Sequence, residues 1–310
     1  MKRILNLALA VTLGLSMMVS TQAQQLRVAT GSQKGTYSAM FKELSAVCST
    51  DVAMIEMATS GSNQNIDLLL GNQVNAVWSQ TDVLFYRART EDLGNVRTLL
   101  AFHPEEVHIV VLAQSLKKEG GTFGIGSKPI NLTQVGDLAG RVVGAAGGSF
   151  TTAQVIRLQS EINFNVLQYK DNDALMVALN KGEIDAALMV GGAPLPLVAA
   201  LTPAYRLLGF PEAVQQKLKN VYRPARLNYS GMGAAGIQSV ATDALFVTRE
   251  YKTAKMIDAL SRFRSCALRQ IDDLKETTGT HPKWQAVDVN NKGKWAYYDL
   301  PGASLPSKKK

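Results

Sequence analysis

The chain has 310 residues, of which 46% are hydrophobic and 19% are charged, a composition typical of a globular protein with about two domains. It contains 2 cysteines and 3 histidines and no tight cluster of metal-ligating residue types, which argues against a zinc ribbon, a disulfide-dense scaffold and most histidine-dependent catalysis. The net charge of +8 includes Lys308, Lys309 and Lys310 at the end of the chain. Because no basic, aromatic-rich segment precedes them, we expect a solvated tail rather than a patch for nucleic acid or anionic lipid.

The first 23 residues have the pattern of a secretory signal peptide. Met1-Lys2-Arg3 is followed by an apolar stretch and then by Thr21-Gln22-Ala23, a small-x-small ending before Gln24. The stretch from Ile4 to Val19 is shorter than the roughly 18–20 residues of a membrane span, so cleavage is favoured over an N-terminal membrane anchor. No cysteine follows that could carry a lipid. We therefore expect an exported, periplasmic protein without a lipid anchor.

Short apolar runs alternate with amphipathic segments through the first part of the mature chain. Ile66, Leu69 and Leu70 recur at helical spacing, and Gly71 follows them as a helix-ending glycine. We predict strands at 26–29, 52–57, 76–78, 96–102 and 107–112, and helices at 37–47, 63–70 and about 82–89. This order is typical of an α/β layer with a largely parallel sheet.

A second alternation follows an irregular region at 114–140, which we interpret as a hairpin and a crossover. We predict strands at 141–145, 164–168, 184–190, 206–208 and 237–248, and helices at 151–161, 173–180, 195–201, 211–219 and about 250–274. Two α/β units with a late return segment indicate two lobes joined by crossing strands. We place one lobe at 24–114 and 230–300, the other at 115–229, and a basic tail at 301–310.

The loops that follow the predicted strands carry the functional signal. Glycine, hydroxyl and amide side chains gather in the loops 31–37, 59–65, 79–82 and 147–152. Open α/β sheets bind ligands outside the carboxyl ends of their strands, and N–H groups at helix starts suit an anionic group. Each loop alone is weak evidence, because residues such as Ser62, Asp82 and Ser149 also serve as ordinary helix caps. Together they indicate a shared binding crevice.

Cys48 and Cys266 lie at the end of the first predicted helix and inside the last one. In an exported protein two cysteines are often paired, and the alternative is two buried thiols that act as small hydrophobic side chains. Pairing is the favoured alternative.

Short motifs also occur in a fixed order along the chain. They are Val28-Ala29-Thr30-Gly31 with Gly35-Thr36-Tyr37, Gly61-Ser62 with Asn65, Gln80 with Asp82, Asp137-Leu138 with Gly140-Arg141-Val142, and Gly182 with Ile184-Asp185-Ala186. In this set the sequence resembles the TAXI family of TRAP-transporter solute-binding proteins over residues 26–274. Two segments depart from the family pattern: Phe150 stands where a glycine is expected, and His281-Pro282-Lys283 replaces a His-Pro-Gly stretch.

The resemblance implies a two-lobe periplasmic-binding-protein fold of type II topology, with the ligand cleft between the lobes. It implies a monomeric receptor that captures a small organic anion, such as a dicarboxylate or an amino acid-like solute, and delivers it to a TRAP-type membrane permease. No cofactor and no metal are expected. The expected ligand contacts are Ser32, Thr36, Tyr37, Ser62, Asn65, Gln80, Asp82, Ser149, Phe150 and Thr151, although Tyr37 has an equal alternative as a core residue of its helix.

An enzyme is disfavoured, because no Gly-x-Ser-x-Gly motif supports a serine hydrolase. We interpret Pro104-Glu105-Glu106 as a turn, which makes His103 and His108 surface or strand-end residues rather than ligands. The alternative function is a sensor or adaptor that presents a bound solute to a membrane signalling partner.

Overall fold

The structure is a computed structural model that describes residues 24–120 and 127–305, so the predicted signal peptide and Lys308, Lys309 and Lys310 lie outside the described residues. Its first part alternates strands and helices, as predicted. The elements are β1 (Leu26–Ala29), α1 (Thr36–Val47), β2 (Met54–Met57), α2 (Ser62–Leu70), β3 (Ala76–Gln80) and α3 (Thr81–Arg87). β1 pairs in parallel with both β2 and β3, so the loops after these strands lie at one edge of the sheet.

A second alternation follows the long strand β4 (Val96–Leu112). It starts after a small hairpin and a short helical turn, and β7 pairs in parallel with both β8 and β9. The elements are β5 (Lys118–Glu119), β6 (Lys128–Pro129), η1 (Val135–Leu138), β7 (Val142–Ala146), α4 (Gly148–Ser160), β8 (Asn165–Tyr169), α5 (Asn172–Asn180), β9 (Ala186–Gly191), α6 (Pro196–Ala199), β10 (Tyr205–Leu207) and α7 (Glu212–Leu218).

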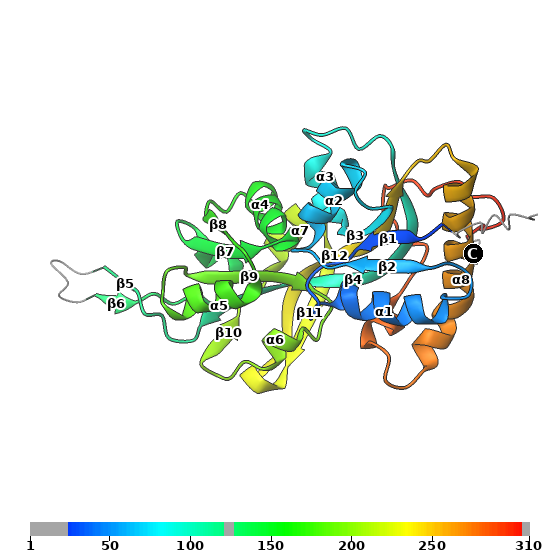
Figure 1. Ribbon diagram of the computed structural model, residues 1–310. Helices are drawn as coiled ribbons and strands as arrows, with labels where there is room; N and C mark the ends of the chain where they lie inside the picture. Colours follow the sequence, from blue (N-terminus) through cyan, green and yellow to red (C-terminus); the bar gives the residue numbers. More distant parts are fainter. Residues whose placement is uncertain (1–23, 121–126, 306–310) are drawn as a thin grey trace, which may run out of the picture.

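The chain then returns to the first part through a second long strand, β12. The returning elements are β11 (Arg223–Tyr229), η2 (Ser230–Met232), β12 (Ala234–Arg249), α8 (Ala254–Glu276) and η3 (Pro282–Ala286). β12 lies between β3 and β4 and is antiparallel to both. The strands run in the order β2-β1-β3-β12-β4-β9-β7-β8, with β10 beside β4 and β11 beside β12. β4 and β12 therefore connect the two α/β units, which lie at opposite ends of the sheet in Figure 1.

Hydrophobic clusters cover both faces of the sheet at each end. Successive β3 residues illustrate this: Trp78 packs with α1 and α8 on one face, and Val77 packs with α2 on the other. We call these two clusters the first core. The second core consists of the clusters around Val143 and Ile156 on one face of β7 and around Leu175 on the other.

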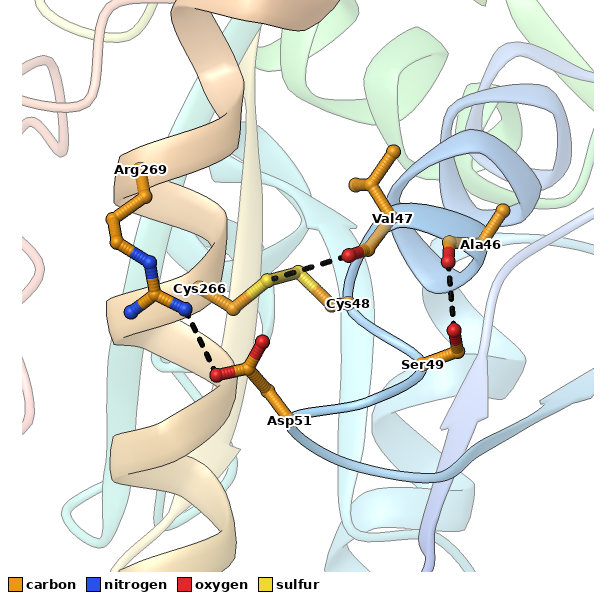
Figure 2. The surroundings of a disulfide bond; sticks show 7 residues. All are labelled: Ala46, Val47, Cys48, Ser49, Asp51, Cys266 and Arg269. Atoms are coloured by element: carbon orange, nitrogen blue, oxygen red, sulfur yellow. Dashed lines mark hydrogen bonds and ion pairs between the residues drawn. A yellow bond between two sulfur atoms is a disulfide. The ribbon is translucent and has the colours of Figure 1, made fainter.

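A disulfide joins Cys48, just after α1, to Cys266 in the middle of α8, across a sequence separation of 218 residues (Figure 2). An ion pair of 2.8 Å between Arg269 and Asp51 lies beside it. Both cysteines are fully buried in the first core. The last helix is thus held covalently against the first.

The structure differs from the sequence-based prediction at two strands. The segment 96–112 is one continuous strand, so the prediction of a turn at Pro104-Glu105-Glu106 is wrong. Pro104 is tolerated because β4 begins to pair with β9 only at Glu106. The prediction also missed β11, an edge strand that pairs with β12 and contains Pro224.

Within residues 24–120 and 127–305, no helix combines the length and the apolar character needed to cross a membrane.

Candidate functional site

The loops from the two ends of the sheet meet in direct contact. Gly61 precedes α2, and Gly147 and Gly148 stand at the start of α4. A Cβ added to Gly147 would lie 1.9 Å from the Ser60 carbonyl oxygen, and one added to Gly148 would lie 2.2 Å from Gln80 Oε1. At Gly147 the neighbour is a backbone oxygen, so only glycine allows this approach; at Gly148 the neighbour is the end of a flexible side chain, which would have to move to admit a larger residue. The loops after β2, β3 and β7, three of the four loops singled out in the sequence, therefore converge.

Asn63 and Thr151 connect α2 to α4 across this contact. The Asn63 side-chain amide donates to the Gly147 carbonyl at 3.0 Å and to the Thr151 hydroxyl at 2.9 Å. Thr151 in turn donates to Asn63 Oδ1 at 3.0 Å. One amide and one hydroxyl are thus used to hold the two ends of the sheet together. Thr151 was expected to contact ligand, and its hydroxyl is used in this link.

Asp82 forms a second, fully buried link. Its carboxylate accepts hydrogen bonds from Thr152 on α4 at 2.6 Å and from Tyr222, just before β11, at 2.7 Å. It also accepts from the Val83 N–H at 2.9 Å. Burial raises the pKa of this carboxyl, and the hydrogen bonds oppose that shift. Asp82 is therefore occupied by contacts within the protein.

Gln80, Ser62 and Tyr37 form a connected polar group beneath the glycine contact. The Gln80 N–H donates to Ser62 Oγ at 3.2 Å. The Tyr37 hydroxyl lies beside Ser62 and donates a hydrogen bond to Glu105 in β4. Gln80 is only 4% exposed, yet its Oε1 has no hydrogen-bond partner within the described residues. A buried acceptor without a donor is costly, so this position suits a bound molecule.

Asn65 and Ser149 are buried and satisfied inside the protein. The Asn65 amide donates to the Thr30 carbonyl at 2.6 Å and to the Trp78 carbonyl at 2.8 Å, and its Oδ1 accepts from Thr59 at 2.5 Å. Ser149 Oγ accepts from the Val190 N–H at 3.0 Å. These two side chains hold the loops in place.

The remaining expected contacts are spread over different surroundings. Thr36 is buried at the first residue of α1. Ser32 is exposed, and its hydroxyl accepts from the Lys34 N–H at 3.4 Å. Phe150 is partly buried and packs against the second core. Of the expected residues, the structure groups Tyr37, Ser62 and Gln80 with their polar atoms directed toward a common region.

The middle of β4 adds charged residues that the sequence analysis missed. Glu105 is 4% exposed and receives the Tyr37 hydroxyl. The neighbouring Glu106 pairs with Lys283 of η3 at 2.6 Å and accepts from the Ala193 N–H at 2.7 Å. Burial raises the pKa of the Glu105 carboxyl to about 8, and no cation among the described residues forms an ion pair with it.

His103 and His108 are fully buried in β4, so the prediction that they are surface or strand-end residues is wrong. Burial lowers the pKa of both rings, to about 4 for His108 and well below the ordinary value for His103. Both are therefore neutral near pH 7. His108 Nε2 lies 2.7 Å from the Tyr229 hydroxyl, whereas neither ring nitrogen of His103 has a partner within the described residues.

A strand irregularity accounts for the position of His103. Phe102 and His103 together oppose the single residue Ala244 of β12, because the register shifts between Asp243 and Leu245. Such a β-bulge rotates the side chains beyond it relative to the rest of the strand. The sequence signal that we missed is a Pro-Glu-Glu triplet with long apolar runs on both sides, which is compatible with a buried strand as well as with a turn.

The described residues offer no metal site, and the groove that they form lies elsewhere. The part of the chain that the structure describes contains no group of three or more His, Cys, Asp or Glu side chains arranged to hold a metal ion. A groove of about 520 Å³ lies between α7 and β11 and is lined by residues such as Gln215, Lys219 and Arg226. That groove includes none of the expected ligand contacts.

Comparison with known proteins places the chain in a family and identifies its fold. No curated protein matches the chain. It is similar to the solved structures of Tv2483 bound to L-arginine (14% identity, TM-score 0.52, covering 86% of this chain and 93% of that one), of the substrate-binding protein of an amino acid ABC transporter (10%, 0.51, 81% and 95%) and of a mutant of ArgBP from T. maritima (13%, 0.51, 84% and 95%).

At these identities the likeness concerns the fold alone, and it confirms the prediction of an α/β periplasmic-binding-protein fold. The model of the NMT1-like family matches residues 28–278, which is most of the sequence. The protein therefore belongs to the NMT1-like family.

Proposed function

We propose that this protein is an exported solute-binding receptor, not an enzyme, which captures a small organic solute and delivers it to a TRAP-type membrane permease. The observation that carries the proposal is the contact between loops from the two ends of the sheet, where the buried Gln80 Oε1 has no partner in the described part of the chain. The neighbours of known structure with the same fold include proteins bound to L-arginine or assigned to amino acid transport. The TRAP-type permease follows from the motif resemblance to the TAXI family.

The two-lobe division supports a closing movement. With residues 24–114 and 230–300 as one lobe and 115–229 as the other, the chain leaves the first lobe just after β4 and returns to it just before β12, so these two long strands lie at the crossing. Asn63, Asp82 and the glycine contacts then join one lobe to the other. Bending of the two crossing strands would separate these contacts and admit a solute, which is how hinged receptors work.

The starts of three helices supply a place for a carboxylate. α1, α2 and α4 begin after Gly35, Gly61 and Gly147, and none of these N-terminal caps has a side-chain hydrogen bond. Their first-turn N–H groups and the helix dipoles favour a negative charge. Together with Tyr37, Ser62 and Gln80, they suit a dicarboxylate or an amino acid-like solute.

A thermal-shift screen of small carboxylates and amino acids tests this function. A solute present at about 100 times its Kd stabilises the protein by about 2.7 kcal/mol, which raises the Tm by several degrees. Uptake by proteoliposomes that contain a TRAP-type permease should then require both the receptor and that solute. A flat screen, in which no small solute changes the Tm, would contradict the receptor function.

A further inference from the structure

The region around the middle of β4 holds more buried carboxyl groups than buried cations. Glu105, Glu106 and Asp82 are all buried and close enough for their charges to affect one another. The buried cation Lys283 acts on the two glutamates, and its ammonium is bonded to both oxygens of Glu106, at 2.6 and 2.9 Å. Glu106 and Lys283 therefore neutralise each other, and Asp82 is held by hydroxyl and N–H donors.

Glu105 differs from Glu106 and Asp82, because it has neither an ion-pair partner nor several hydrogen-bond donors among the described residues. In the part of the chain that the structure describes, its one hydrogen-bond partner is the Tyr37 hydroxyl, a neutral donor on α1. The charged groups that act on it are Asp82 on α3, Glu106 on β4 and Lys283 on η3, and only the last of these favours a negative Glu105. If Glu105 ionised, its buried negative charge would have no ion-pair partner within residues 24–120 and 127–305.

Gln80 points to the same deficiency independently. Its Oε1 is an acceptor, is buried and has no donor within the described residues. The Gln80 backbone N–H donates to Ser62 Oγ, and the Tyr37 hydroxyl lies beside Ser62 and donates to Glu105. Residue Gln80, whose side-chain oxygen lacks a donor within the described residues, thus belongs to the same polar group as Glu105.

We propose that the solute presents a protonated nitrogen to Glu105 and Gln80, and that it is an amine or an amino acid rather than a carboxylic acid without nitrogen. The inference rests on the receptor function proposed above and narrows the class of solute. An ammonium or guanidinium group supplies both the positive charge that Glu105 lacks and the N–H donor that Gln80 lacks. A carboxylate on the same molecule would lie at the helix starts.

A proton balance follows from this arrangement. With its pKa raised to about 8, Glu105 is mostly protonated in the ligand-free protein at pH 7. A bound cation favours the ionised carboxylate, so the Glu105 carboxyl loses its proton to the buffer while the ligand nitrogen keeps its own. Binding of such a solute at pH 7 should release about one proton per molecule bound.

The first test compares two panels in a thermal-shift assay on the mature protein. One panel contains the standard amino acids and small aliphatic amines, and the other contains mono- and dicarboxylic acids without nitrogen. Stabilisation confined to the nitrogen-containing panel supports the inference. Stabilisation by the nitrogen-free acids alone or equally by both panels overturns it but leaves the receptor function standing, whereas no stabilisation in either panel overturns both.

The second test measures proton release and the part played by Glu105. Calorimetric titration of the best nitrogen-containing solute in buffers of different ionisation enthalpy should give about one released proton per site. Glu105→Gln should weaken that solute about 100-fold and abolish the release, because a charged hydrogen bond is replaced by a neutral one. The variant should fold, since glutamine resembles the protonated carboxyl and can still accept from Tyr37.

Glu183→Gln is the matched control. Glu183 follows α5, its side chain is 55% exposed and it lies 3.9 Å from Lys181. This variant should keep both the affinity and the proton release. Unchanged affinity in Glu105→Gln would refute the assignment of Glu105. So would the absence of proton release by the wild-type protein, an outcome that does not depend on the folding of any variant.

Discussion

Asn65 and Gln80 are both buried amide side chains near the glycine contact, but their hydrogen bonds differ. Asn65 uses its amide nitrogen and oxygen on three partners from the loops around it. Gln80 leaves its Oε1 free within the described residues. Because a satisfied buried amide stabilises the fold and an unsatisfied one does not, the same chemical group should serve structure at one position and binding at the other.

The two amides give a paired prediction. Asn65→Ala should lower the free energy of unfolding by about 3 kcal/mol, because two buried carbonyls and a hydroxyl lose their partner. Gln80→Ala should leave stability within about 1 kcal/mol and weaken solute binding about tenfold. Urea denaturation and calorimetry measure the two quantities. An unchanged affinity in Gln80→Ala would remove Gln80 from the binding site.

Glu105 should also give stability a characteristic pH dependence. Burial raises its folded-state pKa from 4.5 to about 8, so the folded protein retains a proton that the unfolded chain has lost, and stability falls as the pH rises. His103, His108 and His281 have lowered pKa values and act in the opposite direction, an effect that fades above about pH 7.5. Between pH 6.5 and 8 we therefore expect the ligand-free protein to lose a net stability of about 1 kcal/mol.

Denaturation at several pH values checks this expectation. Glu105→Gln should abolish this loss of stability over the same interval, while Glu183→Gln should retain it. A wild-type protein that became more stable from pH 6.5 to 8 would show that Glu105 is not protonated in the fold.

At the scale of elements, local sequence pattern was a good guide to helices and parallel strands and a poor guide to β4. The amphipathic spacing of Ile66 and Leu69 predicted α2 because that helix buries one face. The Pro104-Glu105-Glu106 triplet predicted a turn because proline and charge usually end strands. Burial of Glu106 depends on Lys283, a residue distant in sequence, and local pattern does not show such a partner.

The link between α1 and α8 yields a prediction at this scale. A disulfide that closes a loop of 218 residues restricts the unfolded chain and is worth about 5 kcal/mol in the chain-entropy model. Replacing Cys48 and Cys266 together by alanine should therefore lower stability by up to about that amount in guanidinium denaturation. The wild-type protein is measured with and without reductant as the comparison. Equal stability of the reduced and the disulfide-bonded protein would show that packing alone holds α8.

At the scale of the whole molecule, Glu106 joins segments from three parts of the chain. It lies in β4, pairs with Lys283 from the C-terminal segment and accepts from the Ala193 N–H after β9. Gly192 lies against the Lys283 side chain, where an added Cβ would be 2.6 Å from Cγ. In the sequence, His281-Pro282-Lys283 stands out only as a departure from the family pattern, and its position against β4 required the folded structure.

This junction predicts non-additive effects of substitution. Lys283→Met leaves Glu106 as an uncompensated buried charge and should cost about 3–5 kcal/mol of stability. Glu106→Gln together with Lys283→Met removes both charges and should recover a large part of that loss. Denaturation of the single and double variants measures the coupling. Additive losses would mean that the two side chains act independently.

The central place of β12 determines when this chain can fold. β12 lies between β3 and β4, yet it is synthesised after β11 and is followed only by α8 and η3 among the described elements. A nascent chain that ends before residue 234 lacks the strand that separates β3 from β4, and it also lacks Cys266. Such late, long-range pairing slows folding and delays it until almost the whole polypeptide has been made. A translocation channel that accepts only unfolded chains would thus receive this one in a suitable state.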